Sequence, residues 1–300
     1  MHTRRVRKFV APTLPISSRS SSFLVHSLHI LHLLGRLPAL FSFHAMQSLR
    51  HHLEILRTLS LTDFKLRYHG SLLGYIWALL KPLLIFCVLY LVFQFMFGSQ
   101  VEYYALRLLT GIILWSFFAE ATNAGMNSLM QRANIVTKLS VPRWIIPLAS
   151  IATSALSLLI NLGILVLFFM GNGKIPSVGA LLYALALLVL LFVIIIGFSL
   201  LTSVLLPRFR DLGQIWEVLL NALMYATPVI YPITAIPESY RGWFYLNPLT
   251  PFFEHIRLLL IENKYPAMQE VMPLGTIALA TLFVGWIVFN TLQRTIAEQL

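Results

Sequence analysis

Apolar runs long enough to cross a lipid bilayer recur along the chain, and they constrain its fold more than any other feature. One of them, Val178–Leu206, contains no charged residue. A transmembrane helix needs about 20 consecutive apolar residues. The whole chain is 58% hydrophobic and 11% charged, whereas soluble domains carry about 25% charged residues. One water-soluble core cannot hide so much apolar surface, so we predict an all-α integral membrane protein.

The apolar runs predict six transmembrane helices. The predicted spans are Leu72–Phe97, Tyr104–Met130, Trp144–Met170, Val178–Leu206, Leu212–Tyr231 and Val271–Leu292.

Residues 47–62, ahead of the first span, place Leu49, Leu53, Leu56 and Leu59 at helical spacing. This pattern predicts an amphipathic interfacial helix that lies on the membrane surface with its leucines in the acyl boundary. The alternative is a solvated helix that packs on a partner protein.

Residues 1–45 differ in composition from the rest of the chain. They are rich in Ser, Arg and His, and the first acidic residue is Glu54. A transit peptide has this composition, and a start codon placed upstream of a true start at Met46 would give it too. We favour the second interpretation, and we predict an extension over 1–45 followed by a permease domain over 46–300.

The distribution of Lys and Arg predicts the topology, because cytoplasmic loops are enriched in both. With the N-terminus inside, eleven cations after Met46 face the cytoplasm and five face outside, so both termini are predicted to be cytoplasmic. The inside set is Arg50, Arg57, Lys65, Arg67, Lys81, Arg132, Lys138, Arg143, Arg208, Arg210 and Arg294; the outside set is Arg107, Lys174, Arg241, Arg257 and Lys264. The net charge of +11 indicates contact with anionic membrane lipid and not with nucleic acid.

Lys81 and Pro82 lie near the start of the first span. A lysine there can extend its ammonium group to the headgroups, and the proline is expected to kink the helix. Gly70 and Gly74 would allow a turn between the interfacial helix and the span. The alternative is a straight helix that begins at Pro82.

Motifs for catalysis, cofactors and metals are missing from the sequence. The stretch "GNGK" at Gly171–Lys174 has neither the preceding glycine nor the following Ser or Thr of a phosphate-binding loop. His51 and His52 lack metal-site spacing. We predict no catalytic residue, no bound cofactor and no metal site.

Two loops have an organised pattern. Loop 131–143 carries apolar residues between Arg132 and Lys138 and stops at Pro142, which predicts a short helix that a soluble partner could grip; a merely structural loop is the alternative. Loop 232–270 contains two apolar stretches too short to span, which predict re-entrant or interfacial half-helices on the outer face.

Aromatic and acidic residues in or near the spans are candidates for a substrate path. Trp243, Phe244 and Tyr245 could stack on sugar rings, or they could form an aromatic belt at the headgroups. Within the spans, Glu120 is a candidate for a pore or for packing. The predicted path or exit residues are Trp77, Trp115, Glu120, Trp243, Phe244 and Tyr245.

Four stretches together resemble the type-2 ATP-binding-cassette exporter permeases, and more narrowly the membrane subunits that export lipid-linked O-antigen, capsule or teichoic acid chains. They are "DFKLRYHGSLLGYIWALLKPLL", "GIILWSFFAEATNAGMNSLMQRANIVTKLSVPRWIIPLAS", "YATPVIYP" and "LNPLTPFFEHIRLLL", in this order between Met46 and the C-terminus.

The resemblance implies a homodimer of six-span permeases with two separate ATP-binding subunits, which carry the ATP and Mg²⁺, and a polyprenyl-linked polysaccharide substrate in the bacterial inner membrane. It implies that loop 131–143 couples to the ATPase, and that the junction after the interfacial helix connects to span one. The implied coupling residues are Arg132, Ile135, Lys138, Leu139 and Arg143, and the implied junction residues are Asp63, Lys65, Arg67, Tyr68 and Lys81.

Other functions stay open on the sequence alone. One alternative is a drug or small-lipid exporter of the same superfamily, which the sequence separates from a polysaccharide exporter only by the family pattern. A membrane-embedded glycosyl or acyl transferase should cluster acids or a histidine near an interface, and a proton-coupled carrier should pair charges at mid-membrane.

Overall fold

The structure is a computed structural model that describes residues 49–67, 69–70, 74–97, 101–138 and 141–296. The predicted extension 1–45 lies outside these residues. The chain divides into two compact units, Met1–Leu53 and Glu54–Leu300, and of the first unit only residues 49–53 are described, at the beginning of a helix that runs to residue 67.

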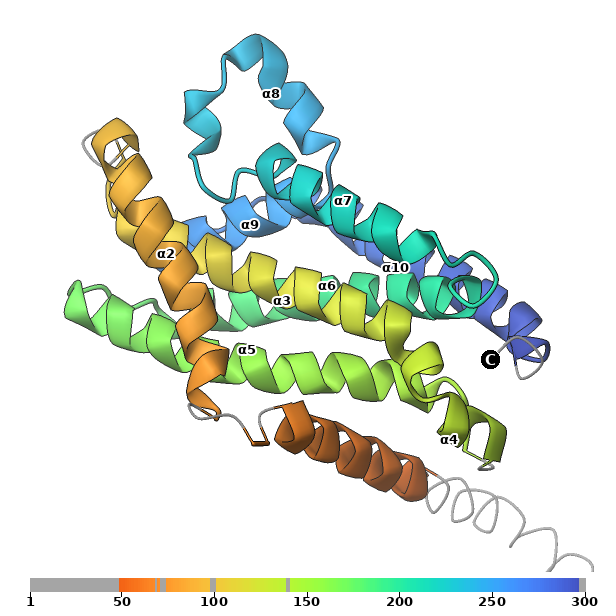
Figure 1. The fold of residues 1–300 in the computed structure, drawn as a ribbon. Coiled ribbons are helices and arrows are strands. Elements are labelled where there is room, and N and C mark those ends of the chain that lie inside the picture. The colour runs from red at the N-terminus through yellow and green to blue at the C-terminus, as the bar shows by residue number, and fades with distance from the viewer. Residues whose placement is uncertain (1–48, 68, 71–73, 98–100, 139–140, 297–300) are drawn as a thin grey trace, which may run out of the picture. The chain divides into compact units, whose positions relative to one another are not determined.

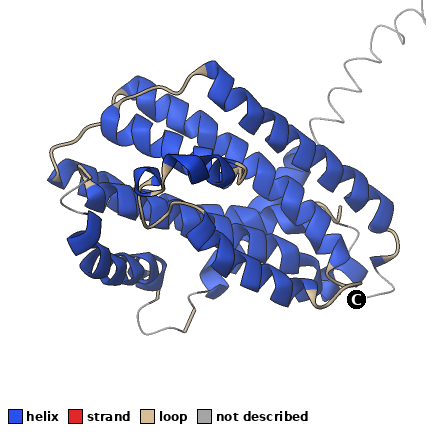
Figure 2. Ribbon diagram, turned by 90° about the horizontal axis from the view of Figure 1, so that it is seen from above, coloured by secondary structure: helices blue, strands red, loops and turns tan. Residues whose placement is uncertain are grey.

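Helices make up the secondary structure of the described ranges, where Figure 2 shows no strand. Five of these helices are long and apolar enough to cross a membrane. They are α2 (Ile76–Phe97), α3 (Tyr104–Gln131), α5 (Ile145–Gly171), α6 (Val178–Leu205) and α10 (Met268–Leu292). The predicted all-α membrane fold is therefore confirmed, and five of the six predicted spans correspond to these helices.

Helix α3 lies at the centre of the bundle, with α5 and α6 packed along it (Figure 1). In its most apolar stretch 72% of the residues are buried, against 17% in α2 and in α10. Helices α6 and α10 approach so closely that a Cβ at Gly285 would lie 2.1 Å from the carbonyl oxygen of Gly197. Small residues permit such contact between membrane helices. The apolar faces of α2 and α10 remain open to lipid or to another subunit.

The fifth predicted span begins as a helix at Leu212 but ends early. Helix α7 covers Leu212–Ala226, about 22 Å at 1.5 Å per residue, which is less than the roughly 30 Å of the hydrocarbon layer. Thr227 is extended, with φ −102° and ψ 134°, because a residue before proline disfavours the helical region and Pro228 follows. Whether the fifth predicted span crosses the membrane, as the sixth crossing of the chain, therefore stays a prediction.

Loop 232–270 folds into short helices, as the two apolar stretches predicted. A 3₁₀ turn, η1 (Ile233–Ala235), is followed by α8 (Glu238–Tyr245), α9 (Leu249–Arg257) and a π-helical turn, η2 (Leu258–Glu262). Their position in a membrane stays a prediction.

The segment before α2 follows the glycine pattern. Gly70 and Gly74 have φ values of +75° and +50°, a region that side chains with a Cβ rarely adopt; the residues between them, 71–73, lie outside the described residues, so the turn as a whole stays a prediction. Pro82 lies inside α2, six residues after its start at Ile76. The alternative in which the helix begins at Pro82 is therefore wrong: the proline lies inside the helix, where membrane helices tolerate proline because neighbouring groups satisfy the freed backbone.

Candidate functional site

The segment after α7 is irregular, and its backbone needs hydrogen-bond partners. Val229 and Ile230 are almost fully buried, and buried carbonyl groups without a partner are costly. A helix would satisfy these groups internally, but Pro228 and Pro232 prevent one here.

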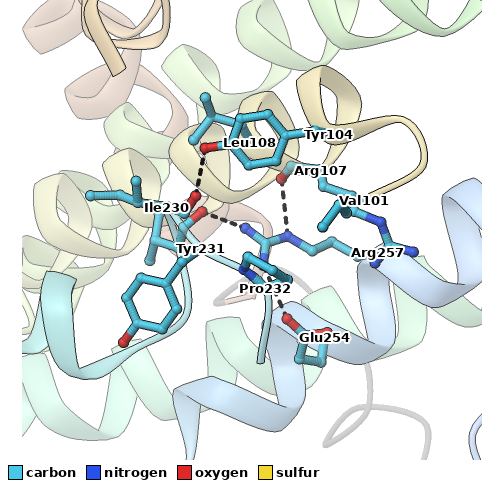
Figure 3. Close-up of a pocket in the computed structure, with 10 residues that line it drawn as sticks. Val101, Tyr104, Arg107, Leu108, Ile230, Tyr231, Pro232, Glu254 and Arg257 are labelled. Carbon is cyan, nitrogen blue, oxygen red and sulfur yellow. Dashed lines mark hydrogen bonds and ion pairs between the residues drawn. The ribbon is translucent and has the colours of Figure 1, made fainter. Parts of the chain in front are cut away.

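Arg257, at the end of α9, supplies most of the missing donors (Figure 3). Its Nη1 donates to the carbonyl of Pro228 at 2.5 Å and its Nη2 to that of Val229 at 2.6 Å. Its Nε donates to the carbonyl of Arg107 in α3 at 3.0 Å. The Tyr104 hydroxyl donates to the next carbonyl, that of Ile230, at 2.9 Å. Three consecutive carbonyls are thereby satisfied from α9 and α3.

A charged guanidinium in this position needs a counter-charge. Arg257 is 3% exposed, and its Nη1 lies 3.1 Å from a carboxylate oxygen of Glu254, one helical turn earlier. Burial lowers the pKa of Arg257, and the Glu254 carboxylate opposes this by raising it. The pair therefore offsets part of the cost of burying the charge of the arginine.

Gly111 in α3 provides the space for the guanidinium. A Cβ at this position would lie 2.1 Å from Nη2 of Arg257 and 2.8 Å from the carbonyl oxygen of Val229. We call Arg257, Glu254, Tyr104 and Gly111 the Arg257 clamp. The cavity beside it holds only about 10 Å³, about the room for one water molecule. The Arg257 clamp therefore holds the segment after α7 against α9 and α3, and it is not a substrate pocket.

A second group of charges joins helix 49–67 to α3. Asp63 forms an ion pair with Arg132, and Arg67 forms one with Glu120. Glu120 also accepts a hydrogen bond from Ser157 in α5 at 3.4 Å. We call Asp63, Arg67, Glu120 and Arg132 the Asp63 junction.

The Asp63 junction is more open than the clamp. Its side chains are 13–36% exposed, and a polar cavity of about 310 Å³ lies among them. One further contact, a 3.2 Å hydrogen bond from the Thr153 hydroxyl to the carbonyl of Ser60, ties the same helix to α5.

Arg132 also marks the start of the predicted coupling helix. Helix α4 covers Ala133–Lys138, directly after Arg132. Val136 is buried and Ile135 half-buried in an apolar cluster of the bundle itself that includes Phe289. The exposed side chains of α4 are polar: Asn134, Thr137 and Lys138. The surface that α4 offers to a partner is therefore polar.

Residues 54–261 match the family of ABC-2 type transporters. This chain belongs to that family. The matched range contains both charge groups and α4, and ends in η2 after the Arg257 clamp. Because family members are transport subunits and five helices can cross a membrane, this ABC-2 chain is a multi-pass membrane transport protein.

Individual relatives extend the similarity over most of the chain. The O-antigen export system permease protein RfbA of Klebsiella pneumoniae is 29% identical over 82% of this chain and 94% of its own length. A protein of the same name from Myxococcus xanthus is 25% identical over 79% and 92%. The polysialic acid transport protein KpsM of Escherichia coli is 22% identical over 79% and 92%.

The predicted coupling and junction residues of this ABC-2 chain lie in several different places. Asp63, Arg67 and Arg132 meet in the Asp63 junction, whereas Lys65 and Lys81 are exposed and make no ion pair with a described residue. Tyr68 and Leu139 lie outside the described residues. Arg143 donates to the carbonyl of Gln293 after α10. Their role in coupling stays a prediction.

The predicted path residues do not form one site within the chain. Trp243 and Tyr245 on α8 are exposed and Phe244 is half-buried, while Trp77 is exposed on α2. Trp115 is buried in the core, where its ring lies 5.8 Å from that of Phe118. Glu120, expected in a pore or in packing, is paired with Arg67. Their role as a path or exit stays a prediction.

Sequence reasoning did not identify the clamp. In the sequence, Arg257 is recognised only as a cation of the predicted outer loop, and nothing singles out Glu254 as its partner. One signal was present: an acid and a base three residues apart on an otherwise apolar stretch, which on a helix lie on the same side.

Within the described ranges, no group of three His, Cys, Asp or Glu side chains could hold a metal ion.

Proposed function

We propose that this chain is the permease subunit of an ATP-driven exporter that moves lipid-linked polysaccharide across the bacterial inner membrane. The observation that carries the proposal is the similarity to O-antigen export permeases over 82% of the chain. The similarity to a polysialic acid transport protein supports the same class of cargo. The excess of Lys and Arg on one side of the spans supports cytoplasmic termini.

The proposed assembly is a homodimer of this chain with two ATP-binding subunits. Those partners bind ATP and Mg²⁺ and carry out the hydrolysis, and this chain does no covalent chemistry. The exposed polar side chains of α4 would contact the partner, and the exposed apolar face of α2 would be available to the second permease subunit or to lipid.

In the proposed mechanism, ATP binding closes the partner subunits and displaces α4. Arg132 precedes α4 directly and is paired with Asp63, so the displacement would reach helix 49–67 and, through the Gly70–Gly74 turn, α2. Helices α2 and α7 of the two subunits would then part and admit the lipid-linked glycan. Because the Arg257 clamp joins the end of α7 to α9, the short helices after α7 would move with it.

Complementation tests the cargo. The chain, expressed with its own ATP-binding partner in a strain without a polysaccharide-export permease, is expected to restore surface polysaccharide, detected on gels and with antibody. A partner that binds but does not hydrolyse ATP is the control, and should restore none. A membrane-inserted complex that restores no polysaccharide but expels dyes or small lipids would favour the drug or small-lipid exporter.

Nucleotide labelling tests the division of labour. Because the sequence has no phosphate-binding loop, the purified chain alone is expected to show no saturable photolabelling by an ATP analogue, whereas the complex should label on the partner subunit. Saturable labelling of this chain would refute the assignment of ATP to the partner.

A further inference from the structure

Helices α5 and α6 are consecutive and antiparallel, but α5 packs mainly against α3, and α6 against α10 and α3, rather than against each other. They leave between them a groove of about 610 Å³, within the roughly 300–1,000 Å³ typical of ligand pockets. Ile113 of α3 and Ile256 of α9, both nearly fully buried, lie at its base, and exposed Val166 and Leu185 form its edges. The groove therefore opens toward the surroundings of the bundle.

The lining is apolar almost throughout, with one charged exception. Lys174, in the turn between α5 and α6, contributes to the lining at one end. Its Nζ lies 4.2 Å from the centre of the Tyr103 ring, and it forms no ion pair with any residue that the structure describes. Glu262, an acid at the end of the neighbouring segment, is already paired with Arg107 and Lys264.

A concave apolar groove that ends at an uncompensated ammonium group fits a molecule with a hydrocarbon chain and an anionic head. Phospholipids, which surround any membrane protein, have hydrocarbon chains and can have an anionic head. Basic residues at the membrane interface attract anionic lipids. Neither α2 nor α7, the helices proposed to part for the substrate, contributes to the groove. The lipid of the bilayer itself is thus the occupant that the position favours.

We propose that the groove between α5 and α6 binds an anionic phospholipid, with one acyl chain along Ile113 and Leu185 and its phosphate on Lys174. The base of the groove includes Ile256, the neighbour of Arg257, so the bound chain packs against the helix that carries the clamp. The lipid-site proposal needs only a membrane-embedded chain. It can therefore fail while the proposed export function holds, and the export function can fail while the lipid site holds.

Native mass spectrometry of the full chain tests the site. The delipidated protein in detergent is titrated with phosphatidylglycerol or with phosphatidylcholine. One phosphatidylglycerol per chain is expected to bind about fivefold more tightly than phosphatidylcholine, the contribution of one interfacial cation. K174A should abolish the preference, whereas K65A, which removes an exposed lysine outside the groove that also forms no ion pair with a described residue, should retain it.

A second pair of variants tests the groove itself. A184F fills it and should weaken the binding of both lipids, whereas L182F, on an exposed position of the same helix outside the lining, should not. Phosphatidylglycerol with a photoreactive acyl chain should crosslink to peptides of α5 and α6. Equal affinity for both lipids in the unaltered chain, or crosslinks elsewhere, would overturn the proposal. Displacement of phosphatidylglycerol by a lower concentration of polyprenyl phosphate would also overturn it, in favour of the substrate carrier.

Discussion

The Arg257 clamp and the Asp63 junction both set arginines against carboxylates, but they differ in burial and in what surrounds the charges. Arg257 is 3% exposed and donates to three carbonyls besides Glu254. In the junction, Arg67 and Glu120 are each about one-third exposed, and Asp63, Arg67 and Arg132 line a cavity of about 310 Å³.

This difference assigns different mechanical roles to the two regions. Breaking a buried pair by removing one partner costs about 3–5 kcal/mol, so detaching the end of α7 from α9 would be costly. Exposed pairs contribute about 0–1 kcal/mol and can exchange partners at little cost. The junction is therefore suited to a connection that changes during a transport cycle.

The largest expected effect comes from removing the cation of the clamp. R257M leaves Glu254 buried without a partner and the carbonyls of Pro228 and Val229 without a donor. We expect the free energy of unfolding in detergent to fall by about 3–5 kcal/mol, measured by denaturant titration. The matched control is R241M, which breaks an Arg–Glu pair of the same i,i+3 spacing, with Glu238 89% exposed, and should cost less than about 1 kcal/mol. Equal losses in the two variants would refute the distinction.

A smaller loss is expected when the space for the guanidinium is filled. G111A places a methyl group 2.1 Å from Nη2 of Arg257, and overpacking of this kind costs about 1–3 kcal/mol. In contrast, G163A in α5 meets no atom within 4 Å and should be neutral or stabilising by up to about 1 kcal/mol. The measurement is the thermal unfolding temperature of both proteins. A destabilised G163A beside a normal G111A would contradict the clamp geometry.

The junction should show the opposite behaviour: a small effect on stability and a clear effect on function. D63N removes an ion pair whose Asp63 and Arg132 side chains are 28% and 13% exposed, between an exposed and a buried pair, so the free energy of unfolding should fall by about 1–2 kcal/mol, less than in R257M. Stimulation of the partner's ATPase activity and export should nevertheless fall, because the connection from Arg132 to helix 49–67 is lost. The double variant D63R/R132D, which restores opposite charges, should recover part of both. Full export by D63N would exclude this pair from coupling.

The smallest expected effect lies on the exposed side of α4. K138E alters a surface charge and should weaken co-purification of the ATP-binding partner by roughly threefold, with little effect on the permease itself. I135D is the comparison, since Ile135 packs on the bundle's own cluster and should destabilise the permease before it affects docking. If I135D is stable but releases the partner, then the apolar side of α4 is the docking surface.

Much of the helical architecture could be predicted from the sequence, for local reasons. The five long helices agree with the predicted spans to within about four residues because apolar runs of this length, with few charges, have no other stable state in a bilayer. The positive φ values at Gly70 and Gly74 could be anticipated because glycine, which has no Cβ, adopts them without steric cost. The early end of α7 at Thr227–Pro228 also had a local signal, which the prediction of a span to Tyr231 overlooked.

The sites depended on contacts that no local pattern encodes. Asp63 and Arg132 were both singled out, but not as partners, because the sequence does not indicate which cation an acid meets. The acceptors of Arg257 lie 28 to 150 residues away along the chain, so its burial follows from the packing of α9 against α3. Gly111 looks like any helical glycine until the guanidinium beside it is known. The apolar runs by themselves determined the helices, and only the tertiary structure decided which charges are buried, because burial depends on neighbours distant in sequence.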